Sequence, residues 1–504
     1  MSTTTPAYAP PDPDRSGTPA TSTKPTTLLA AWPALLALCL TMLVEMLDNT
    51  LLTVALPTIG RDLASGTTGL QWMVAAYSLT FGGLLLVGGS LGDRFGRKRM
   101  LIAGLVGFGA TSALVPLVGS TGQFIALRAA TGVFAALVTP GTMSLLFRLF
   151  DDTTLRMRAI GIIMSVAMAG FAIGPVLGGL AVSHFPWEVL ILVNVPATLI
   201  AVIGVSWGIP ADDPNTLRRN GSDILGAVLS IASLTLSLYA LTLGVSDGWS
   251  SPTTLGCAAA AIAAVVGFVV RERTASDPML DLGLLARPAV RGGMLLQTAV
   301  MTAMVGMGFA STQLLQYAWG WSPMHAGFGT LPIVAGMFLA APATDRMVSR
   351  LGHRMTCLVG VGLAIVGLAS VAVGAPHGYL GVGAGMFALA VGVRFVMTTC
   401  AIALMEELPE THTSMGSALN DTAQELGNSM GVAVVGTVMA AVVGVLLPEG
   451  AWGPLLTHEF VHGLQIACGV LVAVVVAVAA LGLGSLTNSR TLEEHPEPSE
   501  ASAA

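Results

Sequence analysis

The segment GGSLGDRFGRKRM, residues 88–100, closes a long apolar stretch with Asp-Arg, a glycine and further basic residues. A second segment of this kind, ATDRMVSRLGHRM, occupies residues 343–355 and also ends an apolar stretch. An internal repeat indicates a chain built from related units. The positions of the two segments predict two halves, residues 30–209 and 291–485.

The chain is far more apolar than a soluble protein. Hydrophobic residues make up 54% of its 504 residues, 60 residues are glycine, and 10% are charged, whereas soluble domains have roughly 25% charged residues. A transmembrane helix needs ~20 largely uncharged residues, and fourteen such segments follow one another between residues 30 and 485. The alternating pattern of an outer-membrane barrel is not seen in the sequence. We therefore predict an all-α polytopic membrane protein.

The predicted architecture is two six-helix bundles related by pseudo-symmetry, plus two extra central transmembrane helices. Both ends of the chain are rich in Pro and Ser and are predicted to be disordered cytoplasmic tails. The start of the chain lacks the pattern of a cleavable signal peptide. The predicted units are a tail at 1–29, a bundle at 30–209, a linker at 210–290 with an extra hairpin at 223–270, a bundle at 291–485 and a tail at 486–504.

The distribution of Lys and Arg predicts the orientation. With cytoplasmic termini, only Arg61 among the 22 basic residues falls on the outer side, and Arg128 and Arg394 fall within spans. This distribution obeys the positive-inside rule, so we expect a bacterial inner-membrane protein with both termini in the cytoplasm. The tryptophans predicted at outer helix ends are Trp72, Trp187, Trp249, Trp319, Trp321 and Trp452.

Several segments resemble signature motifs of the major facilitator superfamily. Residues 47–60, LDNTLLTVALPTIG, resemble the first-helix motif of the superfamily's fourteen-helix drug:proton antiporter branch. Residues 170–180, GFAIGPVLGGL, resemble the fifth-helix motif of the superfamily's antiporters. Residues 88–98, GGSLGDRFGRK, resemble the superfamily's signature loop, and Asn194 and Pro196 match the sixth helix of the same branch. The resemblance implies a transporter that works by alternating access.

The signature loop has a physical interpretation and an implied role. Asp93 is expected to accept hydrogen bonds at the N-terminus of the next helix, where an anion is favoured. The resemblance implies a latch that holds the two halves closed on the cytoplasmic side. Its residues are Gly89, Asp93, Arg94, Gly96, Arg97 and Lys98.

The fifth-helix motif combines small residues with a proline. Small residues let helices pack closely in lipid, and a proline removes one backbone hydrogen bond. The resemblance adds a hinge and a seal against proton leak to this packing role. Its residues are Gly170, Gly174, Pro175, Gly178 and Gly179.

Six ionisable side chains fall within predicted spans: Glu45, Asp48, Arg128, Arg394, Asp421 and Glu425. Each costs about 2.5–3.5 kcal/mol at the centre of a span, so they should face a cavity or one another. One helix face holds Glu45 and Asp48, and another holds Asp421, Gln424, Glu425 and Asn428. If both arginines pair with acids, two carboxylates keep no basic partner. Competition between a proton and a cation for this acidic surface would couple their movements.

The stretch LNDTAQELGN, residues 419–428, narrows the substrate class. It resembles the thirteenth helix of quaternary-ammonium and multidrug exporters, although Asn420 stands where those exporters commonly have an acid. Arg128 matches the antiporters' fourth-helix arginine, which implies a proton-relay role. The predicted coupling residues are Asp48, Glu45, Arg128, Asp421 and Glu425.

A methionine-rich ninth helix completes the predicted substrate site. Methionine adapts to many shapes, and aromatic rings can hold cations. These residues could equally serve packing alone. The predicted substrate-binding residues are Asp421, Glu425, Asp48, Gln424, Asn428, Met301, Met304, Phe309, Gln313 and Tyr77.

Other functional classes fit the sequence less well. An enzyme would need a nucleophile or metal cluster, but the five cysteines and eight histidines are scattered, so we expect no metal, cofactor or nucleic-acid partner. A channel would need rings of like charge or a filter. The sequence therefore predicts a monomeric, proton-coupled exporter of hydrophobic, cationic compounds. The alternative is a dedicated exporter of one metabolite, antibiotic or siderophore.

Overall fold

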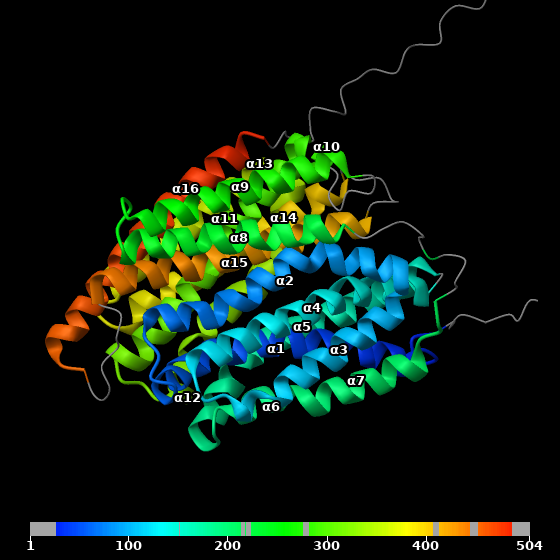
Figure 1. The fold of residues 1–504 in the computed structure, drawn as a ribbon, viewed down its shortest axis with the longest axis horizontal. Helices are drawn as coiled ribbons and strands as arrows, with labels where there is room; N and C mark the ends of the chain where they lie inside the picture. The colour runs from blue at the N-terminus through cyan, green and yellow to red at the C-terminus, as the bar shows by residue number, and fades with distance from the viewer. Residues whose placement is uncertain are drawn as a thin grey trace, which may run out of the picture.

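The computed structural model describes residues 27–150, 152–212, 217, 223–275, 282–406, 413–443 and 452–485. Most of both predicted tails lies outside these residues. Within them the structure is all-helical, which confirms the predicted fold class. The helices run side by side in a long bundle, with the first half of the chain in blue to teal and the second in yellow-green to red (Figure 1).

The described residues of the first half form seven helices, of which α6 is a single short turn before α7. Their bounds are α1 Trp32–Asp62, α2 Thr67–Phe95, α3 Arg97–Ala113, α4 Thr121–Leu149, α5 Thr153–His184, α6 Glu188–Leu192 and α7 Asn194–Gly208. A short 3₁₀ turn, Val115–Leu117, follows α3. Within this half α1 packs on α5 and α7, and α4 packs on α2 and α3.

The rest of the chain contains a helical hairpin and the second half. The bounds are α8 Ile224–Ser246, α9 Pro252–Thr274, α10 Leu282–Ala286, α11 Pro288–Gln313, α12 Pro323–Gly329, α13 Leu331–Gly374, α14 Tyr379–Glu406, α15 Thr413–Val443 and α16 Pro454–Leu483. A π-helical turn, Leu314–Ala318, continues α11. Here α11 packs on α14, α15 and α16, and α13 packs on α14.

Side chains that accept backbone hydrogen bonds fix several helix starts. Ser120 caps α4, Asp152 caps α5 and Asp223 caps α8, as short polar residues commonly do. Asp152 accepts from the amides of Thr154 and Leu155. These bonds from the Leu155 and Thr154 amides hold the pKa of Asp152 below its ordinary value.

The predicted count of fourteen spans is not established by the helices seen. Among the described residues, eleven helices are long and apolar enough to cross a membrane, and a pair bent by 50°, Thr67–Leu85 with Val87–Phe95, would make twelve. One of the eleven, Pro323–Gly374, covers two predicted spans and breaks at Gly352, whose φ of 76° suits glycine. Val228–Gly244 is a shorter apolar helix. Fourteen therefore remains a prediction.

The two ends of the bundle differ in composition. The basic end carries Arg94, Arg97, Lys98, Arg148, Arg158, Arg346 and Arg350, and the aromatic end carries Trp72, Trp187, Trp249, Trp319, Trp321 and Trp452. Between the ends, large apolar side chains such as Ile262, Val373 and Leu380 are exposed. An apolar exterior between polar ends is typical of a helical bundle that lies in lipid.

The halves meet most extensively at two places. Helix α2 of the first half packs along α15 of the second, and α5 packs on α12, while α1 makes smaller contacts with α11 and α12. The hairpin of α8 and α9 adds to the first contact, because α8 lies against both α2 and α15 (Figure 1). The Gln71 side chain on α2 donates to Thr242 on α8 at 3.1 Å, so a polar bond also ties this hairpin to the first half.

Candidate functional site

A buried ion pair joins α1 to α4 in the middle of the first half. Arg128 Nη1 lies 2.6 Å from Asp48 Oδ2, and the two side chains are only 4% and 2% exposed. Asn194 Nδ2 on α7 donates to the other oxygen, Asp48 Oδ1, at 2.8 Å. Both carboxylate oxygens are thus held by N–H donors from two different helices.

The surroundings of the ion pair fix Arg128 in place. The guanidinium lies over the Tyr77 ring, 4.6 Å from its centroid, which is favourable for a cation. Tyr77 is fully buried, and its hydroxyl has no hydrogen-bond partner. Ser112 accepts a bond from Asn194 at 3.4 Å. Tyr77, predicted to bind substrate, therefore lies directly against the predicted proton-relay arginine.

Glu45 lies one helical turn before Asp48 but in a different environment. The Thr139 hydroxyl on α4 lies 3.0 Å from both carboxylate oxygens of Glu45. The residue is only 5% exposed. Within the described part of the chain, no Lys or Arg forms an ion pair with it. Glu45 is therefore a buried carboxylate whose hydrogen-bond partner is a neutral hydroxyl.

The predicted acidic face of α15 lies at the contact with α2. Asn428 Nδ2 donates to Glu425 Oε1 at 2.9 Å, and Gln424 Nε2 to Asp421 Oδ1 at 3.4 Å. Glu425 is 8% exposed, and a side-chain atom added to Gly82 of α2 would lie 2.7 Å from its Cβ. This glycine lets α15 approach α2 at the level of the carboxylate.

The structure brings the two predicted acidic faces together. Asp421 and Glu425 of α15 lie close enough to Glu45 of α1 for their charges to act on it across the interface between the halves, as Asp48 does within α1. Of the two intramembrane arginines, Arg128 pairs with Asp48. Arg394 on α14 forms no ion pair with an acid among the described residues, and its Nε atom is buried without a partner.

The predicted residues of the ninth span lie on α11, which packs on α15 and also contacts α1. Met304, Phe309 and Gln313 are buried, and Gln313 donates to the Phe309 carbonyl at 3.4 Å. Met301 lies against Gly427 of α15, where an added side-chain atom would come within 2.7 Å of it. In this state these residues form helix contacts, and only a separation of the helices would expose the buried ones.

At the basic end, Asp93 accepts hydrogen bonds at the start of the next helix, as expected. The donor is the Arg97 side chain, at 2.9 Å, rather than a backbone amide. The backbone N–H of Lys98 donates instead to Asp212 Oδ2 at 3.0 Å. The physical reason is the tight turn at Gly96, whose φ of 102° brings this amide to Asp212.

Asp212 was missed by sequence reasoning. It also pairs with Arg148 at the end of α4, and the Lys98 ammonium donates to the carbonyls of Ser206 and Ile209 at 2.8 and 2.5 Å. The segment after α7 is thereby tied to the signature loop. An acid after the sixth span was the available signal, but its partners lie far away in the sequence.

At the aromatic end, the fifth-helix motif joins the halves. Side-chain atoms added to Gly170 or Gly174 would collide with α1, and one added to Gly178 would lie only 3.2 Å from Leu51. An atom added to Gly179 would lie 2.3 Å from the Pro323 carbonyl, and one added to Gly327 would lie 2.4 Å from the Pro175 carbonyl. The absence of side chains therefore permits close contact both within the first half and between the halves.

Two hydrogen bonds strengthen the same end. Gln316 donates to the Val54 carbonyl at 2.8 Å, and Tyr317 donates to the Pro57 carbonyl at 3.0 Å. The acceptor at Pro57 is a carbonyl near the end of α1, so the π-helical turn after α11 is fixed to the first half. The halves are thus joined by packing and by polar bonds at the aromatic end.

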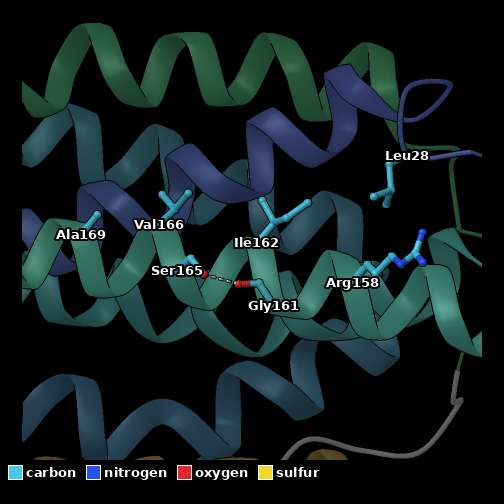
Figure 2. A pocket seen from close by; sticks show the side chains of 7 residues that line it. All are labelled: Leu28, Arg158, Gly161, Ile162, Ser165, Val166 and Ala169. Carbon is cyan, nitrogen blue, oxygen red and sulfur yellow. Dashed lines mark hydrogen bonds between the residues drawn. The ribbon is translucent and has the colours of Figure 1, made fainter. Parts of the chain in front are cut away.

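The basic half of α5 lacks such cover. A hollow of about 610 Å³ lies along it, and Figure 2 shows its lining on one face of α5 with Leu28 at the end. Ile162 and Met164 are 39% and 45% exposed. Helix α5 therefore contacts the second half closely at the aromatic end, whereas this face of its basic half has no such contact. The residues around the hollow are Leu28, Arg158, Gly161, Ile162, Ser165, Val166 and Ala169.

The family model of the Major Facilitator Superfamily matches residues 38–432, from α1 into α15. The chain belongs to the major facilitator superfamily. This match covers every intramembrane charge described above and confirms the resemblance seen in the motifs. The fold and the family together identify a transporter rather than an enzyme.

Characterised relatives have names that refer to drug export or antibiotic resistance. The chain is 34% identical to the multidrug efflux pump LfrA of Mycolicibacterium smegmatis, over 84% of this chain and 83% of that protein. It is 32% identical to the tetracenomycin C resistance and export protein of Streptomyces glaucescens, over 83% of this chain and 78% of that protein. The puromycin resistance protein pur8 of Streptomyces alboniger is 30% identical, over 91% and 92% of the two chains.

Solved structures confirm the fold. A bacterial homologue of the human lysosomal transporter Spinster, inward-facing and unoccupied, matches with a TM-score of 0.62 at 16% identity, over 93% of this chain and 99% of that one. The POT family transporter PepTSo matches with a TM-score of 0.63 at 15% identity, over 90% of this chain and 98% of that one.

Proposed function

We propose that this protein is a proton-coupled efflux antiporter that exports hydrophobic, cationic compounds across the bacterial inner membrane by alternating access. The observation that carries the proposal is the cluster of buried carboxylates between the halves. Three helices contribute to it: α1 with Glu45 and Asp48, α4 with Arg128, and α15 with Asp421 and Glu425. Such charges are costly in a membrane, and transporters place them at their substrate and proton sites.

Alternating access is supported by the different contacts at the two ends. The halves meet closely at the aromatic end, where Gly179 lies against Pro323 and Gly327 against Pro175. The basic half of α5 borders an open hollow. With the basic end in the cytoplasm, as the positive-inside rule favours, this is a state closed to the outside. Opening the aromatic end and covering the exposed face of α5 would give the opposite state.

The acidic surface favours cations as substrates. A buried anionic site attracts a positively charged compound when it is ionised and releases it when it is protonated. The flexible Met301 and Met304 beside it suit ligands of varied shape. We further propose that the protein acts as a monomer, because each chain supplies both halves of the site.

A dedicated exporter of a single compound is the second candidate. It is supported by relatives whose names specify one antibiotic, such as tetracenomycin C or puromycin. The two candidates differ in breadth of substrate rather than in mechanism. Both predict the same dependence on the buried carboxylates.

A substrate-panel assay in inverted membrane vesicles tests the proposal. Vesicles containing the protein, with an acidic interior, should accumulate lipophilic cations such as ethidium and tetraphenylphosphonium, and a protonophore should abolish the uptake. Vesicles without the protein are the control. Uptake of a single compound from the panel would support the dedicated exporter, whereas uptake that survives collapse of the pH gradient would refute proton coupling.

A further inference from the structure

We propose that Glu45 holds the exchanged proton in this state, while Asp48 stays ionised as the partner of Arg128. This inference rests on the proposed proton coupling. It divides the work between two carboxylates that lie one helical turn apart on α1.

The geometry at Asp48 opposes protonation. Its Oδ2 is held by Arg128 Nη1 at 2.6 Å and its Oδ1 by Asn194 Nδ2 at 2.8 Å. Both nitrogens are donors only, so their bonds to Asp48 are strongest when the carboxylate is ionised. A proton on Asp48 would also leave the Arg128 charge buried without a counter-charge, which is strongly unfavourable.

The geometry at Glu45 permits both forms. The Thr139 hydroxyl, 3.0 Å from each oxygen, can donate to an ionised carboxylate or accept from a protonated one. The same hydrogen bond therefore survives the gain or loss of a proton. At Asp48, by contrast, both partner atoms are donors only.

Three other acids surround Glu45. They are Asp48 on α1 and Asp421 and Glu425 on α15. The nearby cation on α4, Arg128, is paired with Asp48, and Tyr77 on α2 lies under that cation. Glu45 is only 5% exposed, so a protonated Glu45 spares this intramembrane site a further negative charge.

Cation binding would reverse this balance. A positively charged compound beside Asp421 and Glu425 offsets their repulsion of Glu45. The O–H bond of the Glu45 carboxyl then breaks, its electron pair stays on the carboxylate, and the proton passes to water at the open end. The protein thereby exchanges a proton for a cationic substrate, while the Asp48–Arg128 ion pair stays unchanged.

Proton release on substrate binding tests this division. Purified protein in weakly buffered detergent is mixed with tetraphenylphosphonium, while a pH indicator measures released protons and equilibrium dialysis measures bound ligand. Wild-type protein should release protons on binding. Glu45→Gln should bind the cation but lose this release, and it should still exchange labelled for unlabelled cation across proteoliposomes without a pH gradient. Glu459→Gln, a matched change at an exposed residue of α16, should behave as wild type.

Infrared difference spectra give a second, independent readout. Cation binding should remove the carbonyl band of a protonated carboxylic acid, and this band should shift in Glu45→Asp and be missing in Glu45→Gln. Unchanged proton release and an unchanged band in Glu45→Gln would overturn the inference, as would loss of the band in Asp48→Asn alone. If wild-type protein binds the cation without releasing any proton, the proposed proton coupling itself fails.

Discussion

Replacing Asp48 by Asn should destabilise the protein because it strands a buried charge. Arg128 is held at 2.6 Å from Asp48, and its side chain is 4% exposed. Removing one partner of a buried ion pair costs about 3–5 kcal/mol. An asparagine can still accept one hydrogen bond, so we expect the lower end, about 3 kcal/mol, or roughly a 150-fold change in the unfolding equilibrium.

The matched control is Asp93→Asn, which breaks the ion pair with Arg97. Those side chains are 28% and 30% exposed, and such pairs contribute only about 0–1 kcal/mol. The free energy of unfolding of both variants would be measured by titration with a denaturing detergent. The double variant Asp48→Asn with Arg128→Gln should recover much of the loss, because the stranded charge is gone. Equal, small effects of Asp48→Asn and Asp93→Asn would refute the claim that the buried pair supports the fold.

Three further predictions concern the substrate, the contact between the halves and the loop. Asp421→Asn and Glu425→Gln should reduce export of cations at least several-fold more than export of neutral drugs, measured per amount of protein in the membrane; equal loss would indicate a structural role only. Gly179→Val should lower transport and favour the state open at the aromatic end, because its side chain would meet the Pro323 carbonyl. Spin-label distances across that end should increase, whereas Gly256→Val, at an uncrowded position of α9, should leave them unchanged. Asp212→Asn should weaken the pairing with Arg148 and the bond to the Lys98 amide; transport should fall while cation binding persists, and full transport activity would contradict a role in gating.

Much of the fold follows from the sequence because lipid imposes strong rules. Apolar segments of spanning length predicted the all-α membrane class. Charge placement within them indicated Glu45, Asp48, Asp421 and Glu425, which lie near one another, but also Arg394, which forms no ion pair with an acid among the described residues. The count of spans did not follow as simply, since Gly352 interrupts one continuous helical segment, Pro323–Gly374. Length and hydropathy do not determine where one helix ends and another begins.

The partners of individual charges could not be predicted. The motif around Asp48 gave no reason why Arg128 rather than Arg394 should pair with it, because that choice depends on how α1, α4 and α14 pack. The partner of Glu45 is Thr139, an ordinary residue within an apolar helix. Asp212 lies over a hundred residues beyond Lys98, its partner. Contacts at such separations depend on the assembled fold rather than on a local pattern.

The most direct test of the central claim uses purified protein in sealed proteoliposomes without ATP or respiratory enzymes. An imposed gradient of tetraphenylphosphonium should drive protons in the opposite direction, seen as a pH change inside the vesicles that a protonophore abolishes. We expect this movement with the wild-type protein and none with empty liposomes. Substrate movement without any opposing proton movement would contradict the account of the protein as a proton-coupled antiporter.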